Sequence, residues 1–176
     1  MNDNFSQQVK DVISYSKEEA LRLGHDQIGT EHLLLGIIRD GEGKAISVLE
    51  ALNVDLDEMR QKIENLNPPK ETDGNSIKNL SLTKQAERAL KTTFLEAKLF
   101  KSPTVNTIHL LLCILRNEND PITKLMNKLD IDYNTVKEEF KFQFQDEEIQ
   151  SPRAENPSFD GGDSDNDFER ASTSKT

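Results

Sequence analysis

The fold of this chain is constrained most by an internal repeat. Residues 5–63 align without gaps with residues 82–140, at a constant offset of 77 positions. The most similar part is "GTEHLLLGIIRD" at 29–40, which returns as "NTIHLLLCILRN" at 106–117. Tandem copies of this kind predict two examples of one structural unit. Because four short helices would expose too much apolar surface alone, we expect the two copies to share one core.

Each copy is predicted to fold as four helices. Apolar residues recur three and four positions apart in both copies, which is the spacing of one buried helical face. No sustained alternating pattern indicates a β-strand. We therefore expect an all-α fold of eight helices, arranged as two tandem, pseudo-symmetric four-helix repeats. The first helix of each copy illustrates the spacing, with Phe5, Val9, Val12, Ile13, Ala20 and Leu23 matched by Leu82, Ala86, Ala89, Leu90, Ala97 and Phe100.

Capping residues indicate where the first two helices of each copy begin. Ser6 and Thr83 stand before the first helix, and Thr30 and Thr107 stand before the second. A hydroxyl at the N-cap accepts a hydrogen bond from a backbone N–H that has no partner inside the helix. We expect all four residues to be N-caps.

The third and fourth helices carry similar signals. Asp120 followed by Pro121 is typical of an N-cap with proline at the first helical position. The third helix of the first copy should therefore open at the equivalent Gly43. Asp55, with Glu58 three residues later, predicts the cap of the fourth helix.

The chain is predicted to hold one domain and a tail. The domain covers residues 1–144, with repeat one at 5–66 and repeat two at 82–142. Between them, residues 67–81 ("NPPKETDGNSIKNLS") contain Pro-Pro and Asp-Gly and predict a loop. Residues 145–176 are acidic, polar and nearly without aliphatic side chains. Such a segment cannot bury enough apolar surface to offset its ordering entropy, so we expect a disordered acidic linker.

Charge and composition exclude several classes of function. The chain carries 22 basic and 32 acidic residues, for a net charge of −10. It lacks the basic excess with which proteins bind nucleic-acid backbones or anionic membranes. No apolar run approaches the roughly 20 residues that span a bilayer, and no secretory signal opens the chain. With Cys113 as its one cysteine, the chain cannot form an internal disulfide. We expect a cytoplasmic protein with no nucleic-acid or membrane partner.

The sequence offers no catalytic motif. "GIIRDGEGK" at 36–44 holds two glycines at the spacing of a phosphate-binding loop. Glu42 and Gly43, however, stand where that loop requires Lys and Ser or Thr. No nucleophile with a matching base is evident either. We expect this domain not to be an enzyme by itself.

The histidines and the cysteine are predicted to be structural. His25, His32 and His109 have no Cys or carboxylate at a metal-ligand spacing such as HExxH. His32 and His109 are repeat-equivalent, which favours a packing or hydrogen-bonding role in the first helical turn. Cys113 takes the place of Gly36 and is expected to be a small core residue. No metal and no cofactor are expected in this domain.

The segment "FSQQVKDVISYSKEEALRLGHDQIGTEHLLLGIIRDGEGKAISVLEAL", with its duplicate ending "HLLLCILRNENDPITKLMNKL", resembles the amino-terminal domain of the ClpC-type Clp/Hsp100 AAA+ ATPases. The resemblance covers about residues 5–142, and "EEALRLGH…IGTEHLLLG" is its most specific block. It implies a substrate- and adaptor-recognition domain of an unfoldase that feeds proteins to the ClpP peptidase. ATP and magnesium would bind only in ATPase modules, which are absent from this chain.

The resemblance also has implications for partners. Adaptor proteins and protein substrates are the expected partners, and ClpP is expected to be reached only through the full-length unfoldase. The acidic tail corresponds to the linker that leads to the ATPase modules. Because hexamers of this family form through those modules, the isolated domain is expected to be a monomer.

Some domains of this type bind phosphoarginine, and the resemblance implies a pocket in repeat one. A carboxylate would hold the guanidinium, while a hydroxyl and a cation at a helix N-terminus would hold the phosphate. Glu31 matches the carboxylate of the "GTEH" block, and Ser6 matches the hydroxyl residue that opens the first helix. Lys10, one helical turn further on, is the expected cation. The predicted ligand-binding residues are Ser6, Lys10 and Glu31.

Repeat two is expected to lack this pocket. Ile108 stands at the position of Glu31 and cannot pair with a guanidinium, and Glu87 replaces Lys10 with the wrong sign for a phosphate. Glu31 also has a purely structural interpretation. A carboxylate in the first turn of a helix faces the positive end of the helix dipole, which is worth about 0.3–1 kcal/mol.

A different class of function stays open at this point. The same repeated helical fold would suit a free-standing regulatory or adaptor protein that docks on another protein. The reading frame beyond residue 176 would separate the two, because an unfoldase subunit would continue into a GxxxxGK[ST] motif.

Overall fold

A computed structural model describes residues 4–71 and 79–150, with side chains as far as residue 144. The chain divides into two compact units, Met1–Glu139 and Phe140–Thr176. The boundary falls within the last helix, so the first unit holds nearly all of the predicted repeats. In the second unit, the rings of Phe140 and Phe144 lie 5.4 Å apart.

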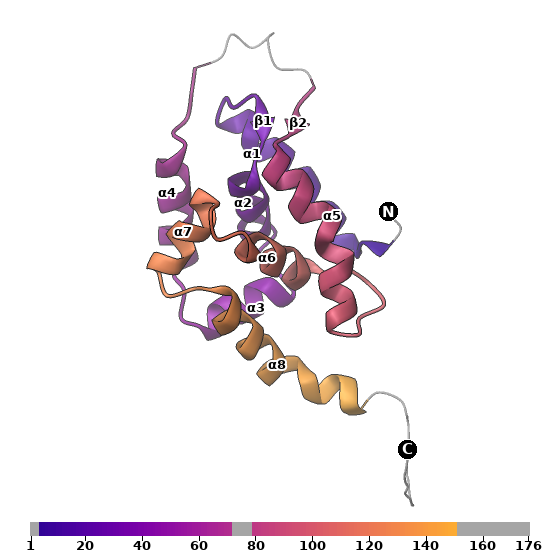
Figure 1. Cartoon of the computed structure of the whole chain (residues 1–176). Coiled ribbons are helices and arrows are strands. Elements are labelled where there is room, and N and C mark those ends of the chain that lie inside the picture. Colours follow the sequence, from indigo (N-terminus) through magenta and orange to yellow (C-terminus); the bar gives the residue numbers. More distant parts are fainter. Residues whose placement is uncertain (1–3, 72–78, 151–176) are drawn as a thin grey trace, which may run out of the picture. The chain divides into compact units, whose positions relative to one another are not determined.

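The first repeat folds into four helices, as the apolar spacing predicted (Figure 1). The third helix opens at Gly43, as expected from its repeat partner. A two-residue strand lies between the first and second helices. The elements are α1 (Gln7–Arg22), β1 (Gln27–Ile28), α2 (Thr30–Asp40), α3 (Gly43–Ala51) and α4 (Leu56–Leu66).

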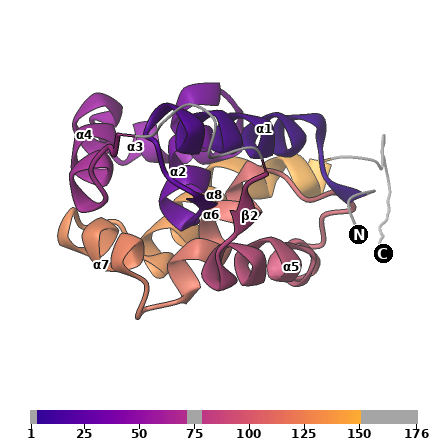
Figure 2. The same ribbon diagram turned by 90° about the horizontal axis from the view of Figure 1, so that it is seen from above.

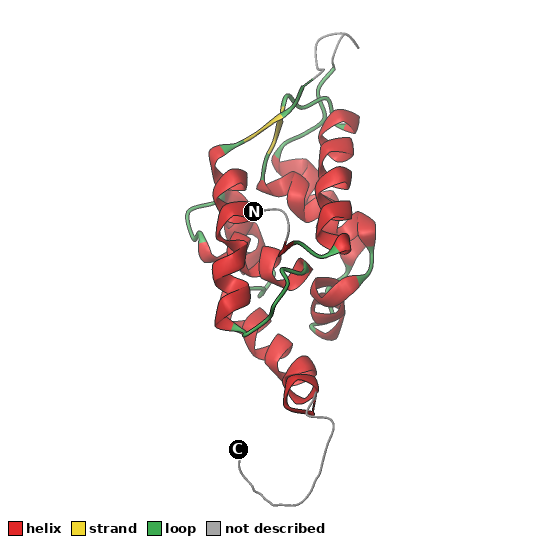
Figure 3. Cartoon of the chain, turned by 90° about the vertical axis from the view of Figure 1, so that its right-hand side faces the viewer, coloured by secondary structure: helices red, strands yellow, loops and turns green. Residues whose placement is uncertain are grey.

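The second repeat also has four helices, with its strand ahead of the first of them, and the prediction of an all-α fold of two four-helix repeats is confirmed. In Figure 3 the described residues are helix and loop, apart from one short pair of strands. None of the described helices is both long and apolar enough to cross a membrane. The elements are β2 (Ser81–Leu82), α5 (Lys84–Leu99), α6 (Thr107–Arg116), α7 (Pro121–Lys128) and α8 (Tyr133–Gln150).

The sequence predicted no strand, but two short parallel contacts connect the repeats. β1 pairs with β2, with Ile28 opposite Leu82. Phe5 forms an isolated parallel bridge with Val105. These two contacts are equivalent under the 77-residue offset, because Phe5 aligns with Leu82 and Ile28 aligns with Val105. Strands of one or two residues leave no alternating pattern, which is why the sequence did not reveal them.

The core of the first unit is built around the second helix of each repeat. Figure 2 shows α2 and α6 between α1 and α5. α6 is buried from Thr107 to Leu115, and α2 from His32 to Ile37. A fully buried leucine stabilises a fold by about 1.5–3 kcal/mol. The repeated "HLLL" block supplies the centre of this core with Leu33, Leu34 and Leu35 from α2 and Leu110, Leu111 and Leu112 from α6.

Four of the predicted helix caps are confirmed. Ser6, Thr83, Asp55 and Asp120 each accept a hydrogen bond from a backbone N–H two or three residues further on, at 2.9–3.2 Å. These caps are local interactions, so the sequence alone was enough to identify them.

The prediction that Thr30 and Thr107 are N-caps was wrong. The N-cap residues are Gly29 and Asn106, and each threonine is the first residue of its helix. Their hydroxyls bond to the other repeat instead. Thr30 Oγ1 donates to the Asp120 carboxylate at 2.9 Å, and Thr107 Oγ1 accepts from the N–H of Ala45 at 3.1 Å. Both threonines therefore link a second helix to the third helix of the other repeat.

The boundary of the predicted tail differs from the structure. α8 continues to Gln150, so residues 145–150 are helical although they were expected to be disordered. The rest of the predicted tail, residues 151–176, lies outside the described residues. Residues 72–78 of the predicted loop also lie outside them.

Candidate functional site

The short strands place helix starts from different repeats side by side. The N–H of Thr83 donates to the carbonyl oxygen of Ile28 at 2.9 Å, which brings the start of α5 to the start of α2. At the equivalent point, the N–H of Ser6 donates to the carbonyl oxygen of Val105 at 2.8 Å. Each junction thus combines the first helix of one repeat with the second helix of the other.

This exchange separates the three predicted ligand-binding residues. Ser6 caps the start of α1, and Lys10 is exposed one turn further on. Glu31 precedes His32, whose ring contacts His25 beyond the other end of α1. Since α1 has 16 residues, its ends are about 24 Å apart. Ser6, Lys10 and Glu31 therefore do not form a single pocket. The sequence could not show this, because it does not reveal that each junction combines helix starts from different repeats.

Glu31 instead lines a cavity of about 260 Å³ together with residues of the second repeat. We call this cavity the Glu31 pocket. It lies where the starts of α2, α5 and α7 meet the end of α4. Its walls are Thr30, Glu31, Leu66, Asn67, Thr83, Gln85, Asp120, Pro121 and Ile122.

The carboxylate of Glu31 is held in a defined position. Its Oε2 accepts a hydrogen bond from Asn67 Nδ2 at 2.9 Å. Its Oε1 lies over Gly29, so close that a Cβ on that residue would be only 2.2 Å away. The side chain of Glu31 is 21 % exposed, which leaves the carboxylate accessible from the pocket.

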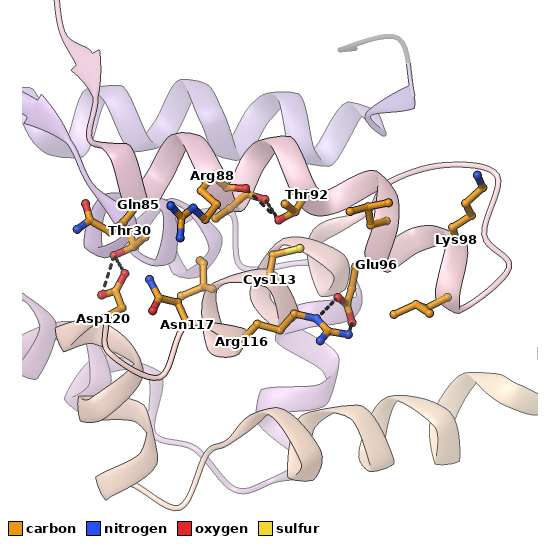
Figure 4. Close-up of a pocket in the computed structure, with 14 residues that line it drawn as sticks. Thr30, Gln85, Arg88, Thr92, Glu96, Lys98, Cys113, Arg116, Asn117 and Asp120 are labelled. Carbon is orange, nitrogen blue, oxygen red and sulfur yellow. Dashed lines mark hydrogen bonds and ion pairs between the residues drawn. The ribbon is translucent and has the colours of Figure 1, made fainter.

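The Glu31 pocket favours a cation. Glu31 and Asp120 both line it, and none of the lining residues is Lys or Arg. Asp120 already accepts hydrogen bonds from Thr30 Oγ1 and from the N–H of Ile122, as Figure 4 shows for Thr30. Glu31 is therefore the carboxylate better placed to receive an incoming donor.

Two hydrogen-bonded histidines connect the start of α2 with the segment that follows α4. The N–H of Gly29 donates to His32 Nδ1 at 2.9 Å, so the proton of a neutral His32 ring is on Nε2. That Nε2–H donates to His25 Nδ1 at 2.7 Å. His25 Nε2–H then donates to the carbonyl oxygen of Pro68 at 2.9 Å. The predicted hydrogen-bonding role of His32 in the first helical turn is confirmed.

The same contacts fix the segment that follows α4. Pro68 is bonded to His25, and Asn67 is bonded to Glu31. The N–H of Lys70 donates to the carbonyl oxygen of Leu23 at 2.8 Å. Residues 67–70 are thus tied to the first repeat along one side of the Glu31 pocket.

His25, Glu31 and His32 are the described residues that come close enough together to hold a metal ion. The hydrogen bonds do not fit that role. His32 Nδ1 accepts from Gly29, so its Nε2 carries a proton and has no lone pair for a metal. Burial also lowers the pKa of His32, against the opposing effect of Glu31. The arrangement is satisfied when both rings are neutral and hydrogen-bonded to each other.

The second junction is closed at the equivalent position. Ile108 is completely buried and is part of the core. Asn106 Oδ1 accepts from the N–H of Ile108 at 3.2 Å, and His109 Nδ1 accepts from the N–H of Asn106 at 3.0 Å. Lys10, on α1, belongs to this junction. Glu87, on α5, belongs to the other and pairs with Lys91 at 3.2 Å.

The architecture defines a class of protein, an all-α domain of two fused repeats with a recess where the repeats meet. Residues 4–129 and 81–171 match the model of the Clp repeat (R) N-terminal domain. The chain belongs to this family.

Two curated relatives and one solved structure agree with this assignment. The chain is 34 % identical over 155 residues to a probable ATP-dependent Clp protease ATP-binding subunit of Chlamydia pneumoniae, covering 86 % of this chain and 18 % of the relative. It is 31 % identical over 139 residues to the negative regulator of genetic competence ClpC/MecB of Bacillus subtilis, covering 79 % and 17 %. The chain therefore spans less than a fifth of these relatives. The N-domain of ClpV from Vibrio cholerae has the same fold, with a TM-score of 0.68 at 15 % identity over 81 % of this chain and 86 % of that one.

Several residues of the Glu31 pocket were missed from the sequence. Thr83 was identified only as a helix cap, and Asp120 likewise. Asn67 fell in the predicted loop and carried no signal. The repeat offset could have indicated that the start of α2 and the start of α6 have similar neighbours. It could not show that those neighbours belong to the other repeat.

Proposed function

We propose that this chain is the substrate- and adaptor-recognition domain of a Clp-type unfoldase. Its membership of the Clp repeat N-terminal domain family supports this, together with relatives named as ATP-binding subunits of an ATP-dependent Clp protease. ATP hydrolysis would take place in modules outside these residues. Captured proteins would be unfolded there and passed to ClpP in the cytoplasm.

Within this role, the Glu31 pocket binds arginine side chains of client proteins, phosphoarginine included. The observation that carries this proposal is the accessible carboxylate of Glu31, held at the meeting point of two helix starts. A guanidinium has five N–H donors in a planar fork that matches a carboxylate. Two of them would bond to Glu31, and the pocket has no cation that would repel them.

The phosphate of phosphoarginine would lie at the start of α5. The first N–H groups of a helix have no partner inside it, and they attract anions. Thr83 is the N-cap of α5 and lines the pocket with Gln85. Because the pocket lacks Lys and Arg, most of the affinity comes from the guanidinium, and the phosphate adds less than it would beside a cation.

Isothermal titration with phosphoarginine and with free arginine tests the pocket. We expect both ligands to bind, and Glu31→Gln to weaken both by about tenfold or more, because a charge-assisted pair is lost. Thr83→Val should weaken phosphoarginine more than arginine. Lys10→Gln is the matched control, since Lys10 lies at the other junction, and it should bind like the wild type. No heat from the wild type with either ligand would exclude the pocket.

The broader role has its own test. Fluorescently labelled, reduced and carboxymethylated α-lactalbumin has no stable fold and serves as a model client. We expect saturable binding to the chain without ATP, measured by fluorescence anisotropy. Binding of this client with no binding of arginine ligands would leave the recognition role in place and exclude the Glu31 pocket. No binding of the client would contradict the recognition role.

A further inference from the structure

A larger recess lies between α5 and α6, with a volume of about 730 Å³. We call it the α5–α6 groove. In Figure 4 Thr92 and Glu96 from α5 face Cys113 and Arg116 from α6 across it. Its apolar surface is provided by Ala89, Leu95, Leu99, Cys113 and Ile114.

Two leucines on the edge of the groove are unusually exposed. Leu95 is 51 % exposed and Leu99 is 63 % exposed. They stand four residues apart on α5, so they lie on the same helical face, one turn apart. Single exposed apolar residues are common on protein surfaces, but an exposed pair beside an apolar recess marks an interaction site.

The first repeat has charged residues at the equivalent place. Glu18 and Arg22 occupy the positions of Leu95 and Leu99. Glu18 pairs with Arg39 at 2.7 Å, and Arg22 pairs with Glu19 at 2.7 Å and with Glu64 at 2.6 Å. Charged residues thus cover this face of repeat one, and the same fold does not require apolar residues there.

The floor of the recess also differs between the repeats. Tyr15 fills the position that Thr92 has in repeat two. The guanidinium of Arg39 lies over the Tyr15 ring, 5.0 Å from its centre. The smaller Thr92 leaves this space open. The second repeat therefore has an open recess with leucines along its edge, where the first repeat has charged residues.

The groove carries unpaired positive charge. Arg88 and Lys98 both line it, and neither forms an ion pair with any residue in the described part of the chain. The carboxylates of the groove are already engaged, Glu96 by Arg116 and Asp120 by Thr30. An occupant therefore meets two free cations beside an apolar surface.

We propose that the α5–α6 groove binds an amphipathic helix of a partner protein, with apolar side chains against Leu95 and Leu99 and acidic side chains toward Arg88 and Lys98. A helix whose apolar residues recur every three or four positions fits a groove between two helices. A second copy of this chain fits less well, because each copy carries a net charge of −10. This proposal does not depend on the Glu31 pocket, so either can fail alone.

The probe is a fluorescein-labelled model peptide of four helical turns. Its leucines recur every three or four positions and form one face of the helix. Glutamates lie on both sides of that face. A second peptide has lysines in place of the glutamates. Fluorescence anisotropy should show saturable binding of the glutamate peptide, and about tenfold weaker binding of the lysine peptide because of Arg88 and Lys98. Equal affinities, or no binding of either, would overturn the proposal.

The variants that test the groove exchange residues between equivalent positions of the two repeats. The double change Leu95→Glu with Leu99→Arg installs the residues of repeat one and should reduce binding by about tenfold or more. Leu21→Lys is the matched control, because Leu21 is 42 % exposed in repeat one and is the equivalent of Lys98. It should change binding by less than about twofold, as should Glu31→Gln. Circular dichroism verifies that each variant is folded.

Two further results would overturn the assignment. A similar loss of binding in Leu21→Lys would mean that any exposed leucine suffices. Light scattering after size exclusion measures the oligomeric state of the wild type and of the double variant. A wild-type dimer that the double variant abolishes would assign the groove to a second copy of the chain.

Discussion

The carboxylate of Glu31 occupies the space that a side chain on residue 29 would need, since a Cβ at Gly29 would lie 2.2 Å from Glu31 Oε1. In the second repeat the same two positions hold Asn106 and Ile108, and there the Asn106 side chain caps the helix. The two repeats therefore differ at both of these neighbouring positions. In repeat one the N-cap residue of α2 is Gly29, which has no side chain, and the Glu31 carboxylate occupies that space.

Gly29→Ala should weaken arginine and phosphoarginine binding about as strongly as Glu31→Gln does, by about tenfold. The added methyl group displaces the carboxylate from its position. The backbone of Gly29, with φ −101° and ψ −179°, suits any residue, so the free energy of unfolding should change by less than about 1 kcal/mol. Titration calorimetry and urea denaturation measure the two effects.

A double-mutant cycle decides whether the effect acts through Glu31. On a Glu31→Ala background, Gly29→Ala should have no further effect on ligand binding, because the displaced group is already gone. An additional loss of similar size would mean that Gly29 contributes to the pocket independently of Glu31.

Arg116 should contribute more to stability than its repeat equivalent Arg39. Glu96 is buried and is bonded by Arg116 Nε at 2.6 Å and by the hydroxyl of Tyr133. Removing Arg116 leaves Tyr133 as the only partner of that carboxylate among the described residues. Arg116 itself is half exposed, and loss of a hydrogen bond to a buried charged group costs about 1.5–3 kcal/mol. We expect Arg116→Ala to lower the free energy of unfolding by that amount.

Arg39→Ala should cost only about 1 kcal/mol, since Glu19 keeps its bond to Arg22 at 2.7 Å. Burial raises the pKa of Glu19, but Arg22 and Arg39 together outweigh this and lower it. Adding Glu96→Gln to Arg116→Ala should recover part of the lost stability by removing the uncompensated charge. Equal costs for the two arginine variants, measured by urea denaturation, would contradict this explanation.

Much of the fold could be predicted because its determinants are local. The caps Ser6, Thr83 and Asp120 act within three residues of themselves, and each helix carries its own apolar spacing. The 77-residue offset then predicted that the second repeat would have the same order of helices. Helix number and order followed from these signals.

The pocket could not be predicted because its determinants are not local. Glu31 and Thr83 meet through strands of two residues, which leave no pattern in the sequence. The hydroxyl of Thr30 looked like a cap, but its bond is with Asp120, ninety residues away. Which helix starts lie together is decided by the packing of the repeats. The sequence grouped Ser6 and Lys10 with Glu31, and the structure places them at opposite ends of α1.

Cys113 should be almost unreactive in the folded chain. It is 6 % exposed, and burial raises the pKa of its thiol to about 12. Because the thiolate is the reactive form, we expect labelling by Ellman's reagent at pH 8 to be at least about 100-fold slower than in the urea-unfolded chain. Leu99→Cys provides an exposed thiol in the same groove and should react rapidly. Rapid labelling of the wild type would show that the groove opens to Cys113.

His109 should make the stability of the domain depend on pH. Burial, with a smaller effect of Lys44, lowers the pKa of His109 to about 4 in the folded chain, against an ordinary value of about 6.5. Below pH 6.5 the unfolded chain binds a proton that the folded chain does not. Stability is therefore complete above that pH and is lost as the pH falls toward 4. Each pH unit in this interval costs up to about 1.4 kcal/mol, so about 2 kcal/mol is lost between pH 6.5 and pH 5.

His109→Gln separates this titration from the structural role of the side chain. Glutamine is a favoured partner in a capping box, because its oxygen can accept the N–H of Asn106 as His109 Nδ1 does at 3.0 Å. The variant should therefore be about as stable as the wild type at pH 5 and should lose less stability between pH 7 and pH 5. Urea denaturation at a series of pH values measures both. A wild-type stability that stays constant over this interval, or an unchanged slope in His109→Gln, would rule out His109 as the titrating group.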